Sequence, residues 1–404
     1  MSVEQHTRRL IGGDALRGAA AIGVICGHVA AYALYTVDHE AVPGAIGFDD
    51  FIAHFGAVGF LLSVVIKSVW VFFVLSGYLV ARPTIAAYCA GRPLPDVRRY
   101  VRNRILRIVP AFWVAIAITI VVLGLRGSGP LDVAAVVLFV QSYAGSAFAR
   151  SIGQAWTLGA ELTFYLLVPL AGFAAVALTG RRWGPRGRVR AVLVGAGAIF
   201  VVSLAAGLLL GRDEQHLRWA PAILFAFMPG VVLAALEQVV PPLVRDRPAG
   251  RRLALGAVLA GLALFVVAGM PGTPSGSGRL VVVLGSGGIL AGILLRQWTD
   301  GRCWRILDNA AFRWVGERSF STYLLHLLAI QIFIGLVGGG SDWSVLGWLT
   351  LLTLAATLPA AALLYRFVEL PFLRIRAGRS PAVADHSAGD VAARPAIAGA
   401  PGPA

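Results

Sequence analysis

The sequence predicts an all-α, polytopic transmembrane helical bundle of about ten spanning helices plus one short re-entrant or interfacial helix. Of its 404 residues, 58% are hydrophobic and only 14% are charged, whereas a soluble protein carries roughly a quarter charged residues. Apolar runs of about 20 residues recur along the chain, and each is long enough to cross the hydrocarbon core of a bilayer. The alternating pattern of a transmembrane barrel is absent from the sequence.

The apolar runs predict ten spans, at 15–36, 62–82, 105–124, 156–178, 191–210, 219–237, 252–269, 279–296, 319–337 and 346–366. The charges of the flanking loops decide whether a shorter apolar segment, 131–142, crosses the membrane. The loops at 82–107 and 181–190 are rich in arginine and belong on the cytoplasmic side. Two spans already separate these loops, so a third crossing at 131–142 would place one of them outside. Twelve residues are also short for a span, which favours a re-entrant or interfacial helix.

Ten spans place both termini in the cytoplasm and predict a multi-pass protein of the inner (plasma) membrane. The net charge of +15 comes from arginines that cluster between apolar runs. This is the positive-inside pattern, so no nucleic-acid partner is expected. We expect one transmembrane domain at 1–376 and a disordered, low-complexity cytoplasmic tail at 377–404.

The first span carries three ionisable residues, which a cleaved signal peptide has no need to tolerate. Arg17 and His28 are eleven residues apart, three helical turns, and therefore share a face; Asp14 lies one turn below Arg17. His28 is about 16 Å deeper than Arg17, near the middle of a core roughly 30 Å thick. Ionisable groups at such depth suggest a substrate path, a proton relay or a reactive site.

Other spans carry polar groups at a similar depth. Glu161 and Tyr165 are one turn apart, and Tyr323 and His326 share a helical face. Lys67 lies in the outer half of the second span. Each group also has a structural interpretation: a histidine that bridges helices, a packing ion pair between Lys67 and Glu161, or hydrogen bonding by Tyr323 and His326. Their common depth favours a functional site.

General-base catalysis is the chemistry that fits His28. Burial favours the neutral imidazole, which can take the proton from an attacking hydroxyl group. Glu161 is the second catalytic candidate, because it could orient His28 or stabilise the charge that the ring acquires. Supporting or acceptor-binding candidates are Asp14, Lys67, Tyr165, Tyr323 and His326. The sequence holds no GxSxG, HExxH or CxxC motif, so no metal site is expected.

Arg104 and Arg107 lie on one helical face where the third span enters from the cytoplasm. They are either ordinary positive-inside flanking residues or a binding site for an anionic donor, because two guanidinium groups bind phosphates in bidentate fashion. A phosphate-bearing donor inside and a deprotonating histidine deeper in the membrane predict a transmembrane group transferase.

The sequence also resembles a known family. The segments "DALRGAAAIGVICGH", "VFFVLSGYLV", "RILRIVPAFW", "WTLGAELTFYLLVPL", "STYLLH" and "RFVELPF" occur in the order typical of the acyltransferase-3 family. Its members are integral membrane O-acyltransferases that modify cell-surface sugars and some secondary metabolites. The resemblance extends over residues 10–376. One departure is that Trp70 and Val71 stand where members often have an acidic residue.

The resemblance implies roles for individual residues. The family's catalytic histidine, which follows a basic residue by eleven positions, corresponds to His28 after Arg17. The family's RxxR, associated with the acyl-CoA donor, corresponds to Arg104 and Arg107, and its W-(S/T)-L-x-x-E glutamate corresponds to Glu161. We expect Arg17 to bind donor phosphate together with these arginines, or else to pair with Asp14.

The resemblance implies an O-acyltransferase that moves an acyl group, most simply acetyl, from cytoplasmic acyl-CoA to a hydroxyl of a surface glycan or glycosylated metabolite. Acyl-CoA is then a co-substrate, and no permanently bound cofactor is expected. Expected partners are acyl-CoA, the carbohydrate acceptor, membrane lipid and, for any second step, a separate extracytoplasmic transferase. The arginine- and alanine-rich composition suggests a bacterial source. The alternative is a transporter or flippase that exports an acylated or anionic small molecule.

Overall fold

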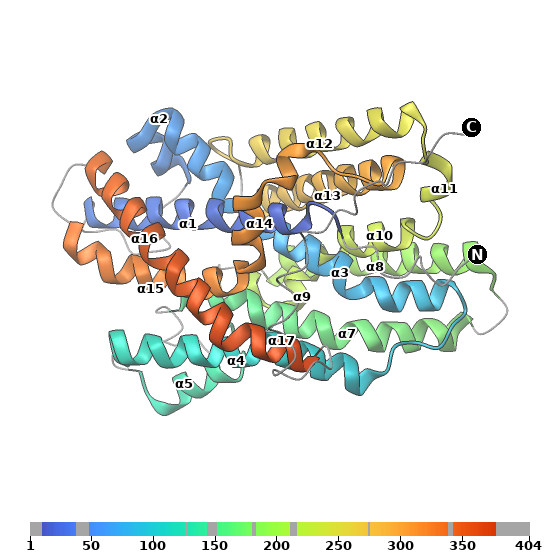
Figure 1. Cartoon of the computed structure of the whole chain (residues 1–404), viewed down its shortest axis with the longest axis horizontal. Coiled ribbons are helices and arrows are strands. Elements are labelled where there is room, and N and C mark those ends of the chain that lie inside the picture. Colours follow the sequence, from blue (N-terminus) through green and yellow to red (C-terminus); the bar gives the residue numbers. More distant parts are fainter. Residues whose placement is uncertain are drawn as a thin grey trace, which may run out of the picture.

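The computed structural model describes residues 10–37, 48–125, 128–143, 152–179, 183–210, 216–273, 275–337 and 342–376. Within these ranges every regular element is a helix (Figure 1). Nine helical stretches in the described part of the chain are long and apolar enough to cross a membrane. The predicted all-α polytopic bundle is therefore confirmed. The predicted tail, 377–404, lies outside the described residues.

Most of the long helices follow the predicted spans, whereas the span predicted at 62–82 falls within a longer helical stretch, Asp49–Cys89. The long helices are α1 (Gly13–Val37), α3 (Val69–Cys89), α4 (Val97–Leu123), α7 (Trp156–Thr179), α8 (Pro185–Leu210), α12 (Pro248–Ala268), α13 (Ser275–Asp300), α15 (Ser319–Val337) and α16 (Asp342–Leu364). Two further elements, α2 (Phe48–Val65) and the 3-10 turn η2 (Ile66–Ser68), run into α3 and form a helical stretch of 41 residues with it. This stretch bends at Gly56, whose φ of 52° suits glycine.

The segment predicted as a span at 219–237 is a broken helix. It consists of α9 (Ala220–Ile223), η5 (Leu224–Phe227) and α10 (Met228–Leu236). Pro229, in the first turn of α10, lacks the N–H that a helix continuous from η5 would need, whereas Pro221 stands at the start of α9, where that N–H has no partner within the helix. The interior of the segment is buried, with Phe227 and Ala234 both at 0% exposure. The described bundle thus holds nine long apolar stretches and one shorter, broken segment in its interior.

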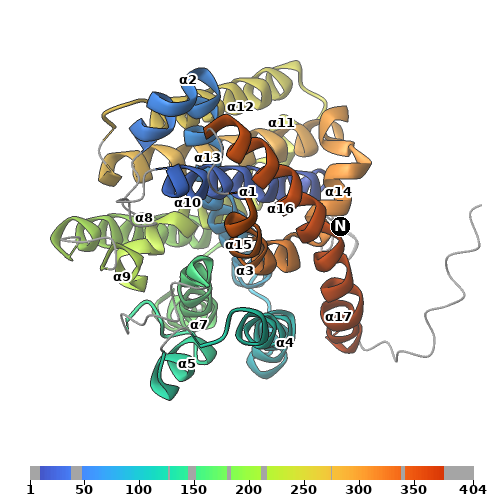
Figure 2. The ribbon, with the colours of Figure 1, turned by 90° about the vertical axis from the view of Figure 1, so that its left-hand side faces the viewer.

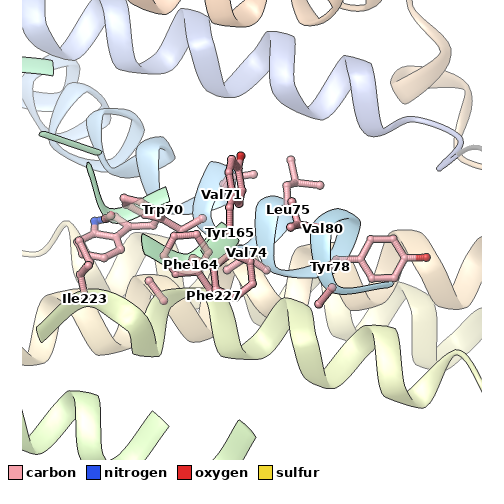
Figure 3. Packing of buried hydrophobic residues seen from close by; sticks show 14 of the residues in the cluster. Trp70, Val71, Val74, Leu75, Tyr78, Val80, Phe164, Tyr165, Ile223 and Phe227 are labelled. Atoms are coloured by element: carbon pink, nitrogen blue, oxygen red, sulfur yellow. The ribbon is translucent and has the colours of Figure 1, made fainter. Parts of the chain in front are cut away.

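The core packs around this broken segment (Figure 3). Phe227 stacks on Phe164 of α7 with ring centroids 4.2 Å apart and an interplanar angle of 13°. A Cβ atom at Gly77 would collide with the carbonyl oxygen of Phe227, and one at Gly230 would collide with that of Val74. These two glycines therefore allow the backbones of α3 and α10 to approach closely.

The short helix predicted in 131–142 is α5 (Pro130–Val137). Its eight residues extend only about 12 Å at 1.5 Å per residue, too little to cross a bilayer. Trp113 Nε1 donates to the Val137 carbonyl at 3.2 Å, which holds α5 against α4. The prediction that this segment does not span is confirmed.

Helix α1 lies at the centre of the molecule, with α12 and α13 on one side and α4, α5 and α7 on the other (Figure 2). The short helix α14 (Ala310–Glu317) crosses α1 at close range, because a Cβ at Gly18 would meet the Phe312 carbonyl and one at Gly316 would meet the Asp14 carbonyl. After α16 the chain forms a π-helix, η7 (Tyr365–Glu369), and then α17 (Leu370–Arg376). The central position of α1 brings its polar residues against several other helices.

Candidate active site

Three cavities share Arg17 of α1 and Arg107 of α4 as lining residues. The first has a volume of about 1370 Å³ and reaches the surface at Arg92 and Arg245, which are exposed. The second is narrow, about 80 Å³, and the third about 550 Å³. Because Arg17 and Arg107 border all three cavities, they lie at the junction between the wide first cavity and the narrow second cavity.

Charge in the first cavity is mixed. Of the described residues, five arginines line it: Arg17, Arg82, Arg92, Arg107 and Arg245. Four carboxylates line it as well: Asp14, Glu237, Glu317 and Glu369. Arg17 Nη1 lies 3.1 Å from Asp14 Oδ1, one turn away on α1. The predicted proximity of Asp14 and Arg17 is confirmed, and their pairing leaves both side chains partly accessible.

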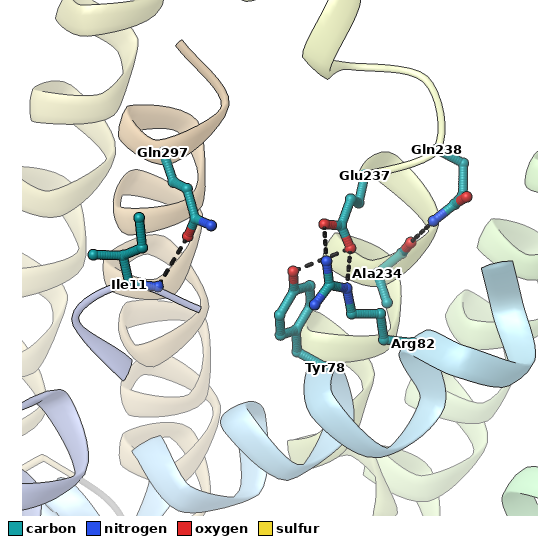
Figure 4. A network of polar contacts seen from close by, with 7 residues as sticks. All are labelled: Ile11, Tyr78, Arg82, Ala234, Glu237, Gln238 and Gln297. Carbon is teal, nitrogen blue, oxygen red and sulfur yellow. Dashed lines mark hydrogen bonds and ion pairs between the residues drawn. The ribbon is translucent and has the colours of Figure 1, made fainter. Parts of the chain in front are cut away.

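Arg82 forms the strongest polar contact of this cavity (Figure 4). Its Nε and Nη2 donate to the two carboxylate oxygens of Glu237 at 2.6 and 2.7 Å. The Tyr78 hydroxyl donates to the same carboxylate at 3.1 Å. This bidentate geometry fixes the guanidinium group on the wall of the cavity.

The two arginines of the RxxR motif have different surroundings. Asp96 caps the start of α4 by accepting a hydrogen bond from the Arg99 amide at 2.7 Å. Arg104, further along α4, lies over the rings of Tyr100 and Tyr165, 5.4 and 5.2 Å from their centroids. It lines only the third of the three cavities, whereas Arg107 lines all three.

Glu161 of α7 lies on the wall of the narrow second cavity. One carboxylate oxygen accepts a hydrogen bond from Ser76 at 3.1 Å, and the other accepts one from Tyr165 at 3.0 Å. Lys67 lies in η2, where its Nζ donates to the Ser63 carbonyl at 2.8 Å. These hydrogen bonds of Glu161 and Lys67 are made with different neighbours. The structure does not show the packing ion pair between Glu161 and Lys67 that the sequence allowed.

His28 and His326 lie ring against ring, with centroids 5.1 Å apart at an interplanar angle of 57°. His28 Nδ1 is 2.9 Å from the Val24 carbonyl oxygen. A carbonyl only accepts hydrogen bonds, so Nδ1 carries the proton of the neutral ring and Nε2 carries the lone pair. His28 is half-buried, whereas His326 is fully buried.

Tyr323 connects the narrow cavity to the two histidines. Its hydroxyl donates to the Gln154 carbonyl at 2.5 Å and lies 2.9 Å from Thr157 Oγ1. Its ring centroid is 5.7 Å from that of His326. The lining of the second cavity includes Tyr323 but not His28, so the cavity ends one side chain short of the paired imidazoles.

The predicted candidates therefore fall into groups. Those around the second cavity are Arg17, Arg107, Glu161, Tyr165 and Tyr323. His28 and His326 form the adjacent pair, Asp14 lies in the first cavity, Arg104 in the third, and Lys67 in none of these three. Among the residues that the structure describes, no three His, Cys, Asp or Glu side chains cluster as metal ligands do.

Sequence reasoning missed several cavity residues, and Glu369 is the most notable. It lies in the π-helix η7, is 3% exposed, and accepts a hydrogen bond from Ser321 at 2.9 Å. It lines the first cavity together with Arg17 and Arg107. The motif "RFVELPF" contained this residue, but nothing in the sequence pointed to its burial. π-Helical turns occur frequently at functional sites.

A comparison with protein-family models matches residues 11–366 to the acyltransferase domain of the acyltransferase-3 family. Searches of curated proteins and of solved structures gave no significant match. The family match covers nearly the whole chain, including every arginine, carboxylate and histidine of the site except Glu369. The multi-pass helical architecture and this match agree. The chain belongs to the acyltransferase-3 family and is a membrane acyltransferase.

Proposed function

We propose that the protein transfers an acyl group, most simply acetyl, from cytoplasmic acyl-CoA to a hydroxyl of a surface glycan or glycosylated metabolite. The observation that carries this proposal is the junction at Arg17 and Arg107. There a wide cavity lined by five arginines and four carboxylates borders a narrow one that ends one side chain short of the His28–His326 pair.

The first cavity suits the nucleotide end of acyl-CoA. CoA carries several phosphate groups, and guanidinium groups bind phosphate oxygens in bidentate fashion. The first cavity, about 1370 Å³, is larger than the roughly 300–1,000 Å³ of most small-molecule sites, which leaves room for a ligand as large as CoA. Arg92 and Arg245 are exposed at its rim, from which a soluble donor can enter. By the positive-inside rule, this basic side faces the cytoplasm, as do both termini.

The second cavity favours a short acyl group. Its volume of about 80 Å³ leaves room for only a few heavy atoms. Its walls include the rings of Phe72, Phe73 and Phe320, beside the polar groups of Glu161 and Ser76. An acetyl thioester can lie in this space, while a long acyl chain would clash with the aromatic walls.

His28 acts as the general base in this proposal. Its Nε2 takes the proton of the acceptor hydroxyl, and the oxygen forms a bond to the thioester carbonyl carbon. The carbon–sulfur bond breaks, and the CoA thiolate takes the proton back from His28 Nε2. The hydrogen bond from Nδ1 to Val24 supports this role, because it leaves Nε2 as the basic nitrogen. Tyr323 stands between the narrow cavity and the histidines, so the acyl group must pass its side chain.

The remaining groups support the two substrates. Glu161 holds the hydroxyls of Ser76 and Tyr165 in fixed positions on the wall that the thioester would contact. Arg104 lies on the neighbouring third cavity, on the cytoplasmic side of the donor. Acyl-CoA is a co-substrate, and the carbohydrate acceptor approaches His28 from the opposite side.

The experiment uses purified protein in lipid nanodiscs with acetyl-CoA labelled in the acetyl group and a glycan extract as the acceptor. We expect release of free CoA thiol in step with label on the saccharide, with neither signal when donor or acceptor is omitted. The Arg313→Ala variant is a matched control, since Arg313 is exposed and paired with Asp308. Movement of saccharide across proteoliposomes without thiol release would instead support the transporter.

A further inference from the structure

Two imidazole rings, those of His28 and His326, lie next to each other beyond the end of the narrow second cavity. His28 Nδ1 is hydrogen-bonded to the Val24 carbonyl oxygen at 2.9 Å, and His326 Nδ1 is hydrogen-bonded to the Tyr323 carbonyl oxygen at 2.8 Å. Because carbonyl oxygens only accept hydrogen bonds, both neutral rings carry their proton on Nδ1. Both Nε2 atoms are then lone-pair acceptors, in rings whose centroids are 5.1 Å apart.

His326 Nε2 is a buried acceptor with no hydrogen-bond partner in the described parts of the chain. The residue has 0% exposure, so bulk water does not satisfy it. An unsatisfied buried polar atom costs about 1–3 kcal/mol, and such an atom in a native fold calls for an explanation. The rest of the ring is fixed by the Tyr323 carbonyl and by the His28 ring. His326 Nε2 is therefore positioned to accept a hydrogen bond from a donor that does not belong to the protein chain.

We infer that His326 Nε2 binds a second hydroxyl of the acceptor, next to the hydroxyl that is acylated, so that the acceptor is a vicinal diol. This inference rests on the proposed function. A simple alcohol has one O–H donor and can serve only one of the two nitrogens. Neighbouring hydroxyls of a sugar ring offer two O–H donors side by side, one for His28 and one for His326, whose ring centroids are 5.1 Å apart.

The two hydroxyls have different fates. The first gives its proton to His28 Nε2 while its oxygen bonds to the thioester carbon, the carbon–sulfur bond breaks, and the CoA thiolate regains the proton from His28. The second hydroxyl keeps its proton in a hydrogen bond to His326 Nε2 and forms no covalent bond. His326 thus selects and orients the acceptor.

The test compares two acceptors of the same ring size, trans-1,2-cyclohexanediol and cyclohexanol, with acetyl-CoA as the donor. For the wild-type protein we expect kcat/KM to be about tenfold higher for the diol, the value of one hydrogen bond to a neutral buried group. The measured quantity is the ratio of kcat/KM for the two acceptors within each variant. A general loss of activity cancels in this ratio.

Two variants separate binding from structural support. In His326→Asn the amide can still donate to the Tyr323 carbonyl, but no acceptor reaches the Nε2 position, so the ratio should fall to about one. In His326→Gln the longer side chain carries an amide oxygen toward the Nε2 position, and part of the preference should return. If both variants lower activity toward the two acceptors equally and the ratio stays at its wild-type value, His326 is only structural and the inference is wrong.

His54→Gln serves as the control, because the exposed His54 is paired with the half-buried Asp342 at 2.7 Å, away from the His28–His326 pair. Equal acetylation of both alcohols by the wild-type protein overturns the diol inference but leaves acyl transfer standing. Acetyl-CoA binding without acetylation of the diol also overturns it. Failure of the wild-type protein to bind acetyl-CoA at all counts instead against the proposed function itself.

Discussion

At the scale of single residues, the two arginines of the RxxR motif are not equivalent. Arg107 borders all three cavities, whereas Arg104 borders the third and lies over Tyr100 and Tyr165. The charge of Arg107 is thus directed at the space that the donor would occupy. The guanidinium group of Arg104 instead makes cation–π contacts with Tyr100 and Tyr165.

Replacement of these arginines one at a time tests this difference. Arg107→Ala should weaken acetyl-CoA binding at least tenfold, because hydrogen bonds to charged groups contribute about 1.5–3 kcal/mol. Arg104→Ala should have a smaller effect, and Arg313→Ala none. The measurement is titration calorimetry of acetyl-CoA with protein in nanodiscs. Equal losses for Arg104→Ala and Arg107→Ala would show that the distinction is mistaken.

Spacing along one helix could be predicted, but contacts between helices could not. The interval between Arg17 and His28 correctly places both on α1, and the pairs Glu161–Tyr165 and Asp14–Arg17 form the contacts that their spacing allows. The His28–His326 pair joins α1 to α15, far apart in the sequence. No pattern within either helix reveals that their rings meet, and the same is true of Arg82 with Glu237.

At the scale of elements, the crossing of α1 and α14 depends on two glycines. The positions that their Cβ atoms would take are filled by backbone carbonyl groups of the other helix. Backbone cannot rotate away as a flexible side chain can, so even a methyl group must push the helices apart. Arg17, one residue before Gly18, would move with them.

We therefore expect Gly18→Ala and Gly316→Ala to destabilise the protein, each by about 1–3 kcal/mol, the usual cost of overpacking. Gly256→Ala is the matched control, because a Cβ on this residue of α12 meets nothing within 4 Å. Its stability should stay equal or rise slightly, since alanine favours helix. Thermal unfolding in detergent, followed by intrinsic fluorescence, gives the comparison. A Tm of Gly18→Ala equal to that of the control would contradict the crossing.

The broken segment has a feature that hydropathy alone does not predict, namely the break in its helix. Residues 219–237 are apolar enough to predict a span, but this measure ignores backbone hydrogen bonds. Pro229 cannot donate the N–H that would continue the helix from η5 into α10, and the structure changes from a 3-10 turn to an α-helix at this position. Helix α5 was predicted more accurately, because both its length and the charges of the flanking loops argued against a crossing.

At the scale of the whole molecule, the account depends on orientation. The first cavity must open to the cytoplasm, where acyl-CoA is found, and α5 must then lie on the opposite side of the membrane. Loop charge supports this orientation. With the broken segment as the tenth crossing, the two ends of the bundle lie on the same side of the membrane, in agreement with this orientation.

Cysteine labelling in intact cells tests the orientation. After replacement of Cys26, Cys89 and Cys303, a single cysteine is introduced at Leu131 or at Arg186, both exposed. A membrane-impermeant maleimide should label Leu131→Cys directly and Arg186→Cys only after permeabilisation. Labelling of both positions in intact cells, or the reverse order, would contradict the predicted topology.

The central claim is that His28 removes the proton of the acceptor hydroxyl while acyl-CoA is held by the arginines. The most direct measurement is the single-turnover rate of acetyl transfer for wild type and His28→Gln, together with acetyl-CoA affinity. The account predicts a rate at least about 100-fold lower in His28→Gln with unchanged affinity. A His28→Gln variant that transfers acetyl at the wild-type rate would contradict the account.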